Sequence, residues 1–244
     1  MSSRITFAFA RRVLEQLRRD PRTLVLILGV PCLLETLLQQ LFGRHSVAFQ
    51  HAGAPLLGLF PFVAMFLVTS ITMLRERTSG TLERLMTMPL HKVDVLAGYG
   101  IAFALVAVLQ AALVSLLAFG LLGLNVAGPQ WLVVALAVGN AVLGSSLGLF
   151  VSAFAQTEFQ AVQFMPAVVF PQILLCGLFV PRGHMADWLR AVSDALPLSY
   201  AYDALARTAA NVLDARFALD VAVVAGCIVL AVTLGAATLR RRTA

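Results

Sequence analysis

Six apolar stretches of about twenty residues each constrain what this chain can fold into. A helix rises ~1.5 Å per residue, so a stretch of this length crosses the ~30 Å hydrocarbon core of a bilayer. Of the 244 residues, 60% are hydrophobic and only 12% are charged, against about 25% charged in soluble domains. Several stretches are apolar on every face, which is untypical of surface helices. The sequence therefore predicts an all-α polytopic membrane protein, one transmembrane domain over 1–244, with six spans at about 23–42, 55–74, 95–122, 131–155, 159–180 and 217–239.

An amphipathic helix is predicted ahead of the first span, over residues 2–20. Apolar residues and arginines interleave there at helical spacing, whereas a secretory signal has an uninterrupted apolar core. At ~100° per residue, the apolar side chains fill one half of the helix and the arginines crowd into the other. Such a helix lies in the membrane interface with its arginines toward lipid phosphates. Asp20 and Pro21 are expected to end it and turn the chain into the membrane.

The distribution of basic residues predicts the orientation in the membrane. Of the 18 Lys and Arg residues, six precede the first span, four lie between 75 and 94 and three follow the last span. Because cytoplasmic connections carry the excess of Lys and Arg, both termini and the 75–94 connection are predicted to be cytoplasmic. The basic residues flank apolar runs, so the net charge of +6 indicates membrane lipids rather than nucleic acid as partners. Arginine greatly outnumbers lysine, which favours a bacterial source and hence the bacterial plasma membrane.

The charged connection between the second and third spans, residues 76–89, is the candidate contact for a soluble partner. If 80–88 is helical, an apolar ridge and a charged flank lie on separate faces. Such a helix suits docking into a groove of a soluble protein, and the alternative is an interfacial helix that only caps the bundle. The residues expected to make the docking contact are Glu76, Gly80, Thr81, Leu82, Glu83, Leu85, Met86 and Pro89.

The first span carries a carboxylate, Glu35, with Gln39 after it. A charged group near mid-membrane costs about 2.5–3.5 kcal/mol on insertion scales, so Glu35 is expected to face protein or a water-filled cavity. Two interpretations stay open. Either these side chains line a substrate path or form a polar lock between helices, or Glu35 is protonated or hydrogen-bonded near the outer boundary and has no transport role.

Residues 181–216 are too long for a plain loop. Helical spacing on both sides of Pro197 predicts two short, half-buried helices that cap the outer face of the bundle. The arginines of this cap are matched in number by its aspartates, so it is neutral overall. The cysteines all lie inside apolar runs and the histidines in expected loops, so neither a metal site nor a catalytic site is predicted.

Two motifs resemble a known family. The run from Glu76 to Leu85, followed by Pro89, resembles the cytoplasmic motif of ABC type-2 exporter permeases, in particular the daunorubicin-resistance type of drug and lipid exporters. The run 175–181 and the residues after it resemble the end of the family's fifth span and its outer re-entrant helices. The matching residues of this outer cap are Pro181, Trp188, Pro197, Tyr200 and Asp203. The amino-terminal helix resembles the elbow helix of the family.

This resemblance implies a permease without its own motor, in which two separate ABC ATPase subunits bind ATP and Mg and the chain itself binds no cofactor. The sequence agrees, because no GxxxxGK[ST] phosphate loop occurs in it. A second permease copy, or a paralogue, would complete a path for an amphipathic drug-like or lipid substrate. The chain departs from the family at Met88, Tyr99 and Cys176, where threonine, lysine and serine are common.

Three other functions are alternatives for a polytopic membrane protein. An ion-coupled secondary transporter needs several buried ionisable groups, whereas only Glu35 stands clearly inside a span, with Asp220 near the outer end of the sixth. A membrane-embedded enzyme needs clustered catalytic side chains at membrane depth. A non-conducting partner subunit, which senses or scaffolds while a paralogue conducts, stays an alternative.

Overall fold

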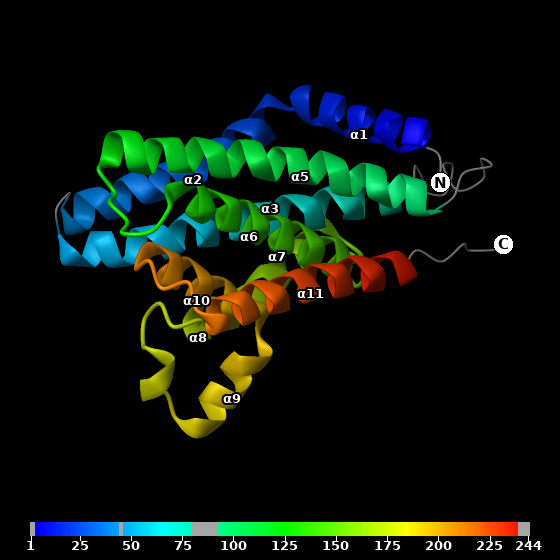
Figure 1. Cartoon of the computed structure of the whole chain (residues 1–244). Coiled ribbons are helices and arrows are strands. Elements are labelled where there is room, and N and C mark those ends of the chain that lie inside the picture. Colours follow the sequence, from blue (N-terminus) through cyan, green and yellow to red (C-terminus); the bar gives the residue numbers. More distant parts are fainter. Residues whose placement is uncertain (1–2, 44–45, 80–91, 239–244) are drawn as a thin grey trace.

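The computed structural model describes residues 3–43, 46–79 and 92–238, which form helices and short connections without a β-strand among them (Figure 1). Five helices are long and apolar enough to cross a membrane. They are α2 (Pro21–Phe42), α3 (Val47–Thr78), α5 (Lys92–Leu117) with its π-helical continuation η1 (Ala118–Leu122), α6 (Gln130–Val151) and α11 (Ala215–Ala237). The start of α5 and the end of α11 lie at the same end of the bundle (Figure 1). The predicted class, an all-α polytopic membrane protein, is confirmed.

The pairing of α3 with α6 forms the centre of the bundle. In the apolar windows of these helices, 61% of α3 and 56% of α6 is buried, against 17% of α2 and 11% of α11. Gly144 and Gly148 let the two backbones touch, since a methyl group on either would overlap the carbonyl oxygen of Phe62 or Phe66, respectively. Small residues one turn apart permit this close approach. The GxxxG pair of α6 is therefore the seam of the core.

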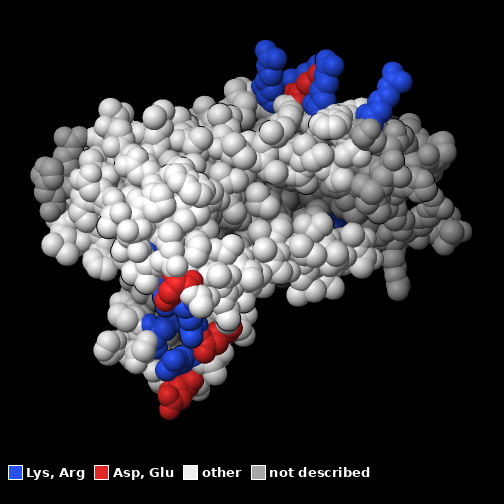
Figure 2. All heavy atoms as spheres, viewed as in Figure 1, with Lys and Arg blue, Asp and Glu red and all other residues white. Residues whose placement is uncertain are grey.

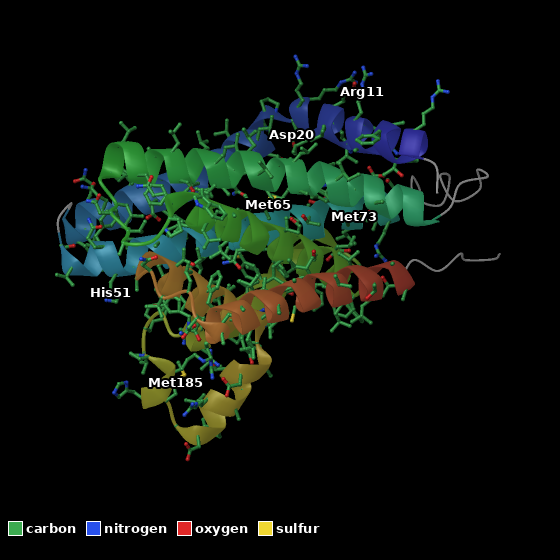
Figure 3. The ribbon with its side chains drawn as sticks, viewed as in Figure 1. Arg11, Asp20, His51, Met65, Met73 and Met185 are labelled. Carbon is green, nitrogen blue, oxygen red and sulfur yellow. The ribbon has the colours of Figure 1, made fainter. Side chains whose placement is uncertain are left out.

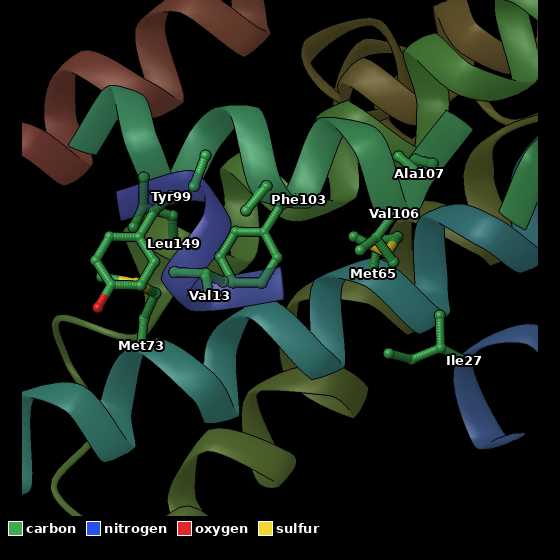
Figure 4. Close-up of a cluster of buried hydrophobic side chains, with 12 residues drawn as sticks. Val13, Ile27, Met65, Met73, Tyr99, Phe103, Val106, Ala107 and Leu149 are labelled. Atoms are coloured by element: carbon green, nitrogen blue, oxygen red, sulfur yellow. The ribbon is translucent and has the colours of Figure 1, made fainter. Parts of the chain in front are cut away.

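The amphipathic helix α1 (Ser3–Arg18) runs alongside the start of α5 (Figure 1). Gly98 of α5 permits the contact, because a methyl group there would lie 2.9 Å from the carbonyl oxygen of Thr6. Ala10 and Val13 of α1 enter a buried cluster with Tyr99 and Phe103 of α5 (Figure 4). The apolar half of the predicted helix thus packs in part on protein rather than wholly on lipid.

The second long helix is longer than predicted. The sequence predicts a span at 55–74 after a polar loop, but α3 begins at Val47 and continues to Thr78. Its amino terminus is capped by Ser46, whose side chain accepts a hydrogen bond from the Phe49 N–H at 3.1 Å. Polar residues such as His51, which projects from the first turns of α3 (Figure 3), lower the hydropathy of this part of the helix, so hydropathy alone does not predict it. Prolines inside α3 are tolerated because neighbouring helices can satisfy the freed backbone groups.

The predicted fifth span, 159–180, is helical from Glu158 to Leu175, with a π-helical turn in the middle. It consists of α7 (Glu158–Phe164), the π-helical turn η2 (Met165–Val169) and α8 (Phe170–Leu175). Pro166 and Pro171, where the sequence predicts a bend, supply no backbone N–H. The helix widens at Pro166, inside η2, and Pro171 lies in the first turn of α8. The span at 159–180 stays a prediction. The count of six spans stays a prediction, since the five helices above meet the length and composition of a membrane span.

Two short helices follow on either side of Pro197, as the sequence predicts. The 3₁₀ turn η3 (Arg182–His184) leads to α9 (Asp187–Ala195), and α10 (Pro197–Ala209) begins with that proline in its first turn. α10 packs back against α3, α6 and α11, whereas α9 projects from the side of the bundle (Figure 1). We call residues 181–216 the cap.

Candidate functional site

The carboxyl end of α3 is tied to two other helices just before residues 80–91, which the structure does not describe. Arg75 donates two hydrogen bonds to the carboxylate of Glu158, at the start of α7, from Nε at 2.7 Å and from Nη2 at 3.0 Å. Arg77 donates one to the hydroxyl of Thr238, after α11, at 3.3 Å. The Arg75 guanidinium holds the pKa of the exposed Glu158 carboxyl below its usual value. These contacts link the last turns of α3 to the start of α7 and to the residue after α11.

Glu76 lies on the inner side of the same turn and joins it to α1. Its side chain is only 4% exposed, and its Oε2 is 3.6 Å from Nη2 of Arg12. The Tyr99 side chain of α5 is buried close to both charges. A buried carboxylate is costly without a cation beside it, so Arg12 is the group that permits Glu76 at this position. The pair links the amphipathic helix to the end of α3.

A polar pocket of about 730 Å³ lies between α1 and this end of α3. It is lined by Arg12, Glu15, Gln16, Arg19, Arg75, Glu76, Thr78 and Ser79. Figure 2 shows charged side chains gathered over α1 and over the cap, with a largely uncharged surface between them. With both signs of charge and several hydroxyl or amide groups, the pocket can bind a polar peptide segment. Because it borders Ser79, we call it the α3-end pocket and take it as the candidate site.

The predicted docking segment falls largely outside the described residues. This applies to Gly80, Thr81, Leu82, Glu83, Leu85, Met86 and Pro89. Glu76 is described, but it belongs to α3 and is buried, so its carboxylate does not lie on the surface of a separate docking helix. The first residues of the predicted segment therefore continue α3, which ends at Thr78. The docking role of these residues stays a prediction.

Glu35 and Gln39 lie where α2 packs on α3, and both are buried. A methyl group on Gly53 of α3 would come 3.4 Å from Oε1 of Glu35, so the carboxyl sits against the α3 backbone. Neither of its oxygens has a hydrogen-bond partner among the described residues. This position, inside the chain rather than on a lipid face, agrees with the expectation that Glu35 faces protein. A function in a substrate path stays a prediction.

Arg182 links the three short helices of the cap. Arg182 pairs with Asp203 of α10 at 2.6 Å and with Asp194 of α9, and its guanidinium lies 5.5 Å from the centre of the Tyr200 ring. The Tyr200 hydroxyl donates to the carbonyl oxygen of Asp194 at 2.7 Å. Burial raises the pKa of Asp203 despite the arginine beside it. The arrangement joins η3, α9 and α10 into one unit.

The predicted cap residues are thus only partly brought together. Tyr200 and Asp203 belong to the Arg182 cluster, and Pro197 begins α10. Pro181 immediately precedes η3, and Trp188 is a largely exposed residue of α9. These three positions shape the backbone or the surface of the cap and are not part of the ion-pair cluster.

Sequence reasoning missed the ion pair that attaches the cap to α11. Nε of Arg207 in α10 lies 3.4 Å from Oδ2 of Asp220, which is buried inside α11, and Nη1 of Arg207 lies 3.1 Å from Asp214. Both aspartates were visible in the sequence, and so was the equal number of arginines and aspartates in 181–216. That balance predicts neutrality but does not name the partners, which depend on how α10 packs on α11.

These features define a multi-pass, all-helical membrane protein in which the carboxyl end of α3 carries a cluster of charged side chains. Residues 5–209 match the ABC-2 type transporter family, and the chain belongs to this family.

Three relatives illustrate the similarity. The chain is 25% identical over 173 residues to ABC transporter G family member 20 of Dictyostelium discoideum, covering 70% of the chain and 24% of the relative. It is 27% identical over 148 residues to the probable multidrug ABC transporter permease YbhR of Escherichia coli (strain K12), covering 61% and 40%. It is 25% identical over 141 residues to the linearmycin resistance permease protein LnrN of Bacillus subtilis (strain 168), covering 57% and 36%. Each alignment therefore spans less than half of the relative's length.

Proposed function

We propose that this chain is the transmembrane subunit of an ATP-driven exporter in the bacterial plasma membrane, with both termini cytoplasmic. Its substrate is an amphipathic drug-like or lipid molecule, which leaves from the cytoplasm or the inner leaflet. Membership of the ABC-2 type transporter family supports the permease function. The names of two relatives, a probable multidrug permease and a linearmycin resistance permease, support the substrate class. Two ABC ATPase subunits hydrolyse ATP, and a second permease copy or a paralogue completes the path.

The observation that carries this proposal is the set of contacts at the end of α3. Ser79, which borders the α3-end pocket, is the last described residue before residues 80–89, and these would dock on the ATPase. When the ATPases close, they push on the last turn of α3. Glu76 ties that turn to α1, Arg75 ties it to α7, and Arg77 ties it to Thr238 after α11. A rigid-body shift of the docking segment would then tilt several helices together and open the path outward.

The test reverses one charge in the docking segment. Glu83→Arg should leave the protein in the membrane, while the ATP hydrolysed per substrate molecule exported rises sharply or export stops. Asp187→Arg, a matched reversal at an exposed position of α9, should keep normal coupling. The readouts are membrane content, co-purification with the ATPase, ATP turnover and export from the same membranes. Normal export by Glu83→Arg, with the ATPase still bound, would contradict the docking assignment.

A further inference from the structure

A second groove lies between α1 and α5, on the flank of the bundle. Its volume is about 330 Å³, and it is lined by Phe7, Ala10, Arg11, Leu14, Glu15, Arg18, Ile101 and Leu105. Glu15 also borders the α3-end pocket, but the remaining lining is different. The groove thus combines an apolar floor from both helices with two arginines on the side of α1. The groove is therefore partly apolar, whereas the α3-end pocket is lined by polar and charged residues.

Both arginines are exposed and present nitrogens that can bind an anion. Arg18 is exposed at the last residue of α1. Arg11 is exposed as well, projects outward from α1 (Figure 3) and donates from Nε to Glu15 at 2.8 Å. This bond leaves both terminal nitrogens of Arg11 without a protein partner in the described part of the chain. With Glu15 counted, the groove carries one net positive charge.

The apolar floor continues along α5 beyond the groove. Leu105, Leu109 and Leu116 are all exposed and recur at helical spacing. From Leu105 to Leu116 the track advances eleven residues, about 16 Å at ~1.5 Å per residue. The first membrane-length helix begins at Pro21, three residues after Arg18, so the arginine end of the groove is close in the chain to the start of a candidate span. From there the leucine track runs along a helix that is itself long and apolar enough to span.

We propose that this groove binds one anionic phospholipid. Its phosphate lies between Arg11 and Arg18, and one acyl chain follows Leu105 to Leu116 along α5. The arginine-plus-leucine arrangement matches a molecule that is anionic at one end and apolar over the remaining length. The bound lipid fills the gap between α1 and α5 and so fixes the amphipathic helix against the bundle. This site is independent of ATPase docking and of the exported substrate.

Site-specific quenching tests the proposal in reconstituted full-length chain. Both native tryptophans are replaced (Trp131→Phe, Trp188→Phe), and Leu105→Trp places a reporter in the groove. One series of vesicles contains phosphatidylcholine with increasing amounts of brominated phosphatidylglycerol. In a second series the bromine is on phosphatidylcholine instead. One net positive charge stabilises a bound anionic lipid by about 1 kcal/mol, so phosphatidylglycerol should bind near the Leu105 reporter about fivefold more tightly than phosphatidylcholine. A reporter at Val229→Trp, an exposed residue of α11, in the same background should show a much smaller preference, because no residue of α11 lines the groove.

Charge variants decide whether the groove is a discrete site. Arg11→Gln with Arg18→Gln should abolish the preference at the Leu105 reporter, whereas Arg4→Gln, an exposed arginine of α1 outside the groove lining, should leave it unchanged. The proposal would be overturned if phosphatidylglycerol and phosphatidylcholine bound equally well near the Leu105 reporter in the parent. It would also be overturned if the preference for phosphatidylglycerol survived the double substitution. An equal loss with Arg4→Gln would overturn it as well, because that loss would indicate general surface charge. Mass spectrometry of the chain with its native tryptophans, released from mixed micelles, should show one retained phosphatidylglycerol; equal retention of phosphatidylcholine would contradict the site.

Discussion

Substituting alanine for Gly144 should separate the two central helices and destabilise the protein. A methyl group at Gly144 would lie 2.9 Å from the carbonyl carbon of Phe62 and would overlap the carbonyl oxygen. Carbon atoms in contact prefer about 3.5–4.0 Å, so α6 must withdraw by roughly 1 Å or the α3 backbone must bend. Phe62 is fully buried, so no open space exists to absorb the shift. Overpacking of this kind costs about 1–3 kcal/mol.

The same helix supplies a matched control. A methyl group at Gly139 meets nothing within 4 Å, so Gly139→Ala should be neutral or stabilising by up to about 1 kcal/mol through helix propensity. Thermal unfolding in mild detergent compares the two variants. For a chain of this size, about 2 kcal/mol corresponds to a midpoint lowered by roughly 4–8 °C. Equal midpoints for Gly144→Ala and Gly139→Ala would refute the argument that α3 and α6 touch through their backbones.

Three further predictions concern charged side chains. Arg12→Gln should destabilise the protein more than Glu76→Gln, by on the order of 2 kcal/mol in thermal unfolding, because it leaves the buried carboxylate alone; equal effects would show that another group neutralises Glu76. The Arg75–Glu158 ion pair should stabilise the protein by under about 1 kcal/mol at pH values above the usual glutamate pKa, where Glu158 is ionised. Because the pKa of Glu158 is lowered in the folded protein, this stabilisation should be lost as the pH falls through that lowered pKa. A stability difference between the parent and Arg75→Gln that does not change with pH would contradict this prediction. Glu35→Met should raise the unfolding midpoint, since it removes a buried carboxyl without a hydrogen-bond partner among the described residues; a lowered midpoint would mean that the carboxyl has a partner.

Much of the fold was predictable because a bilayer restricts the choices. Buried backbone groups in lipid must be satisfied within the chain, so long apolar stretches become helices whatever their neighbours are. The alternation of arginines with apolar residues likewise predicted α1 before any packing was known. The two cap helices followed from the position of Pro197, which can begin a helix but not continue one.

Other features depended on competition between local signals. Pro55 looked like the start of a span, yet it lies inside α3, because the cap at Ser46 and the packing of α3 override a single proline. Pro166 and Pro171 predicted a bend, but the extent of the π-helical widening depends on how α7 and α8 meet their neighbours. Local signals such as proline therefore indicated where a helix can change, whereas packing between helices decided where the helix actually begins or widens.

The sequence by itself determined that the chain is an all-helical membrane protein and which stretches become its long helices, because the bilayer acts on each stretch separately. Only the tertiary structure decided which charges meet. Glu76 pairs with Arg12, and Asp220 pairs with Arg207, through helices that are distant in sequence or turn back on each other. Each carboxylate must find a cation within a few ångströms, and no periodicity along one helix specifies a partner on another.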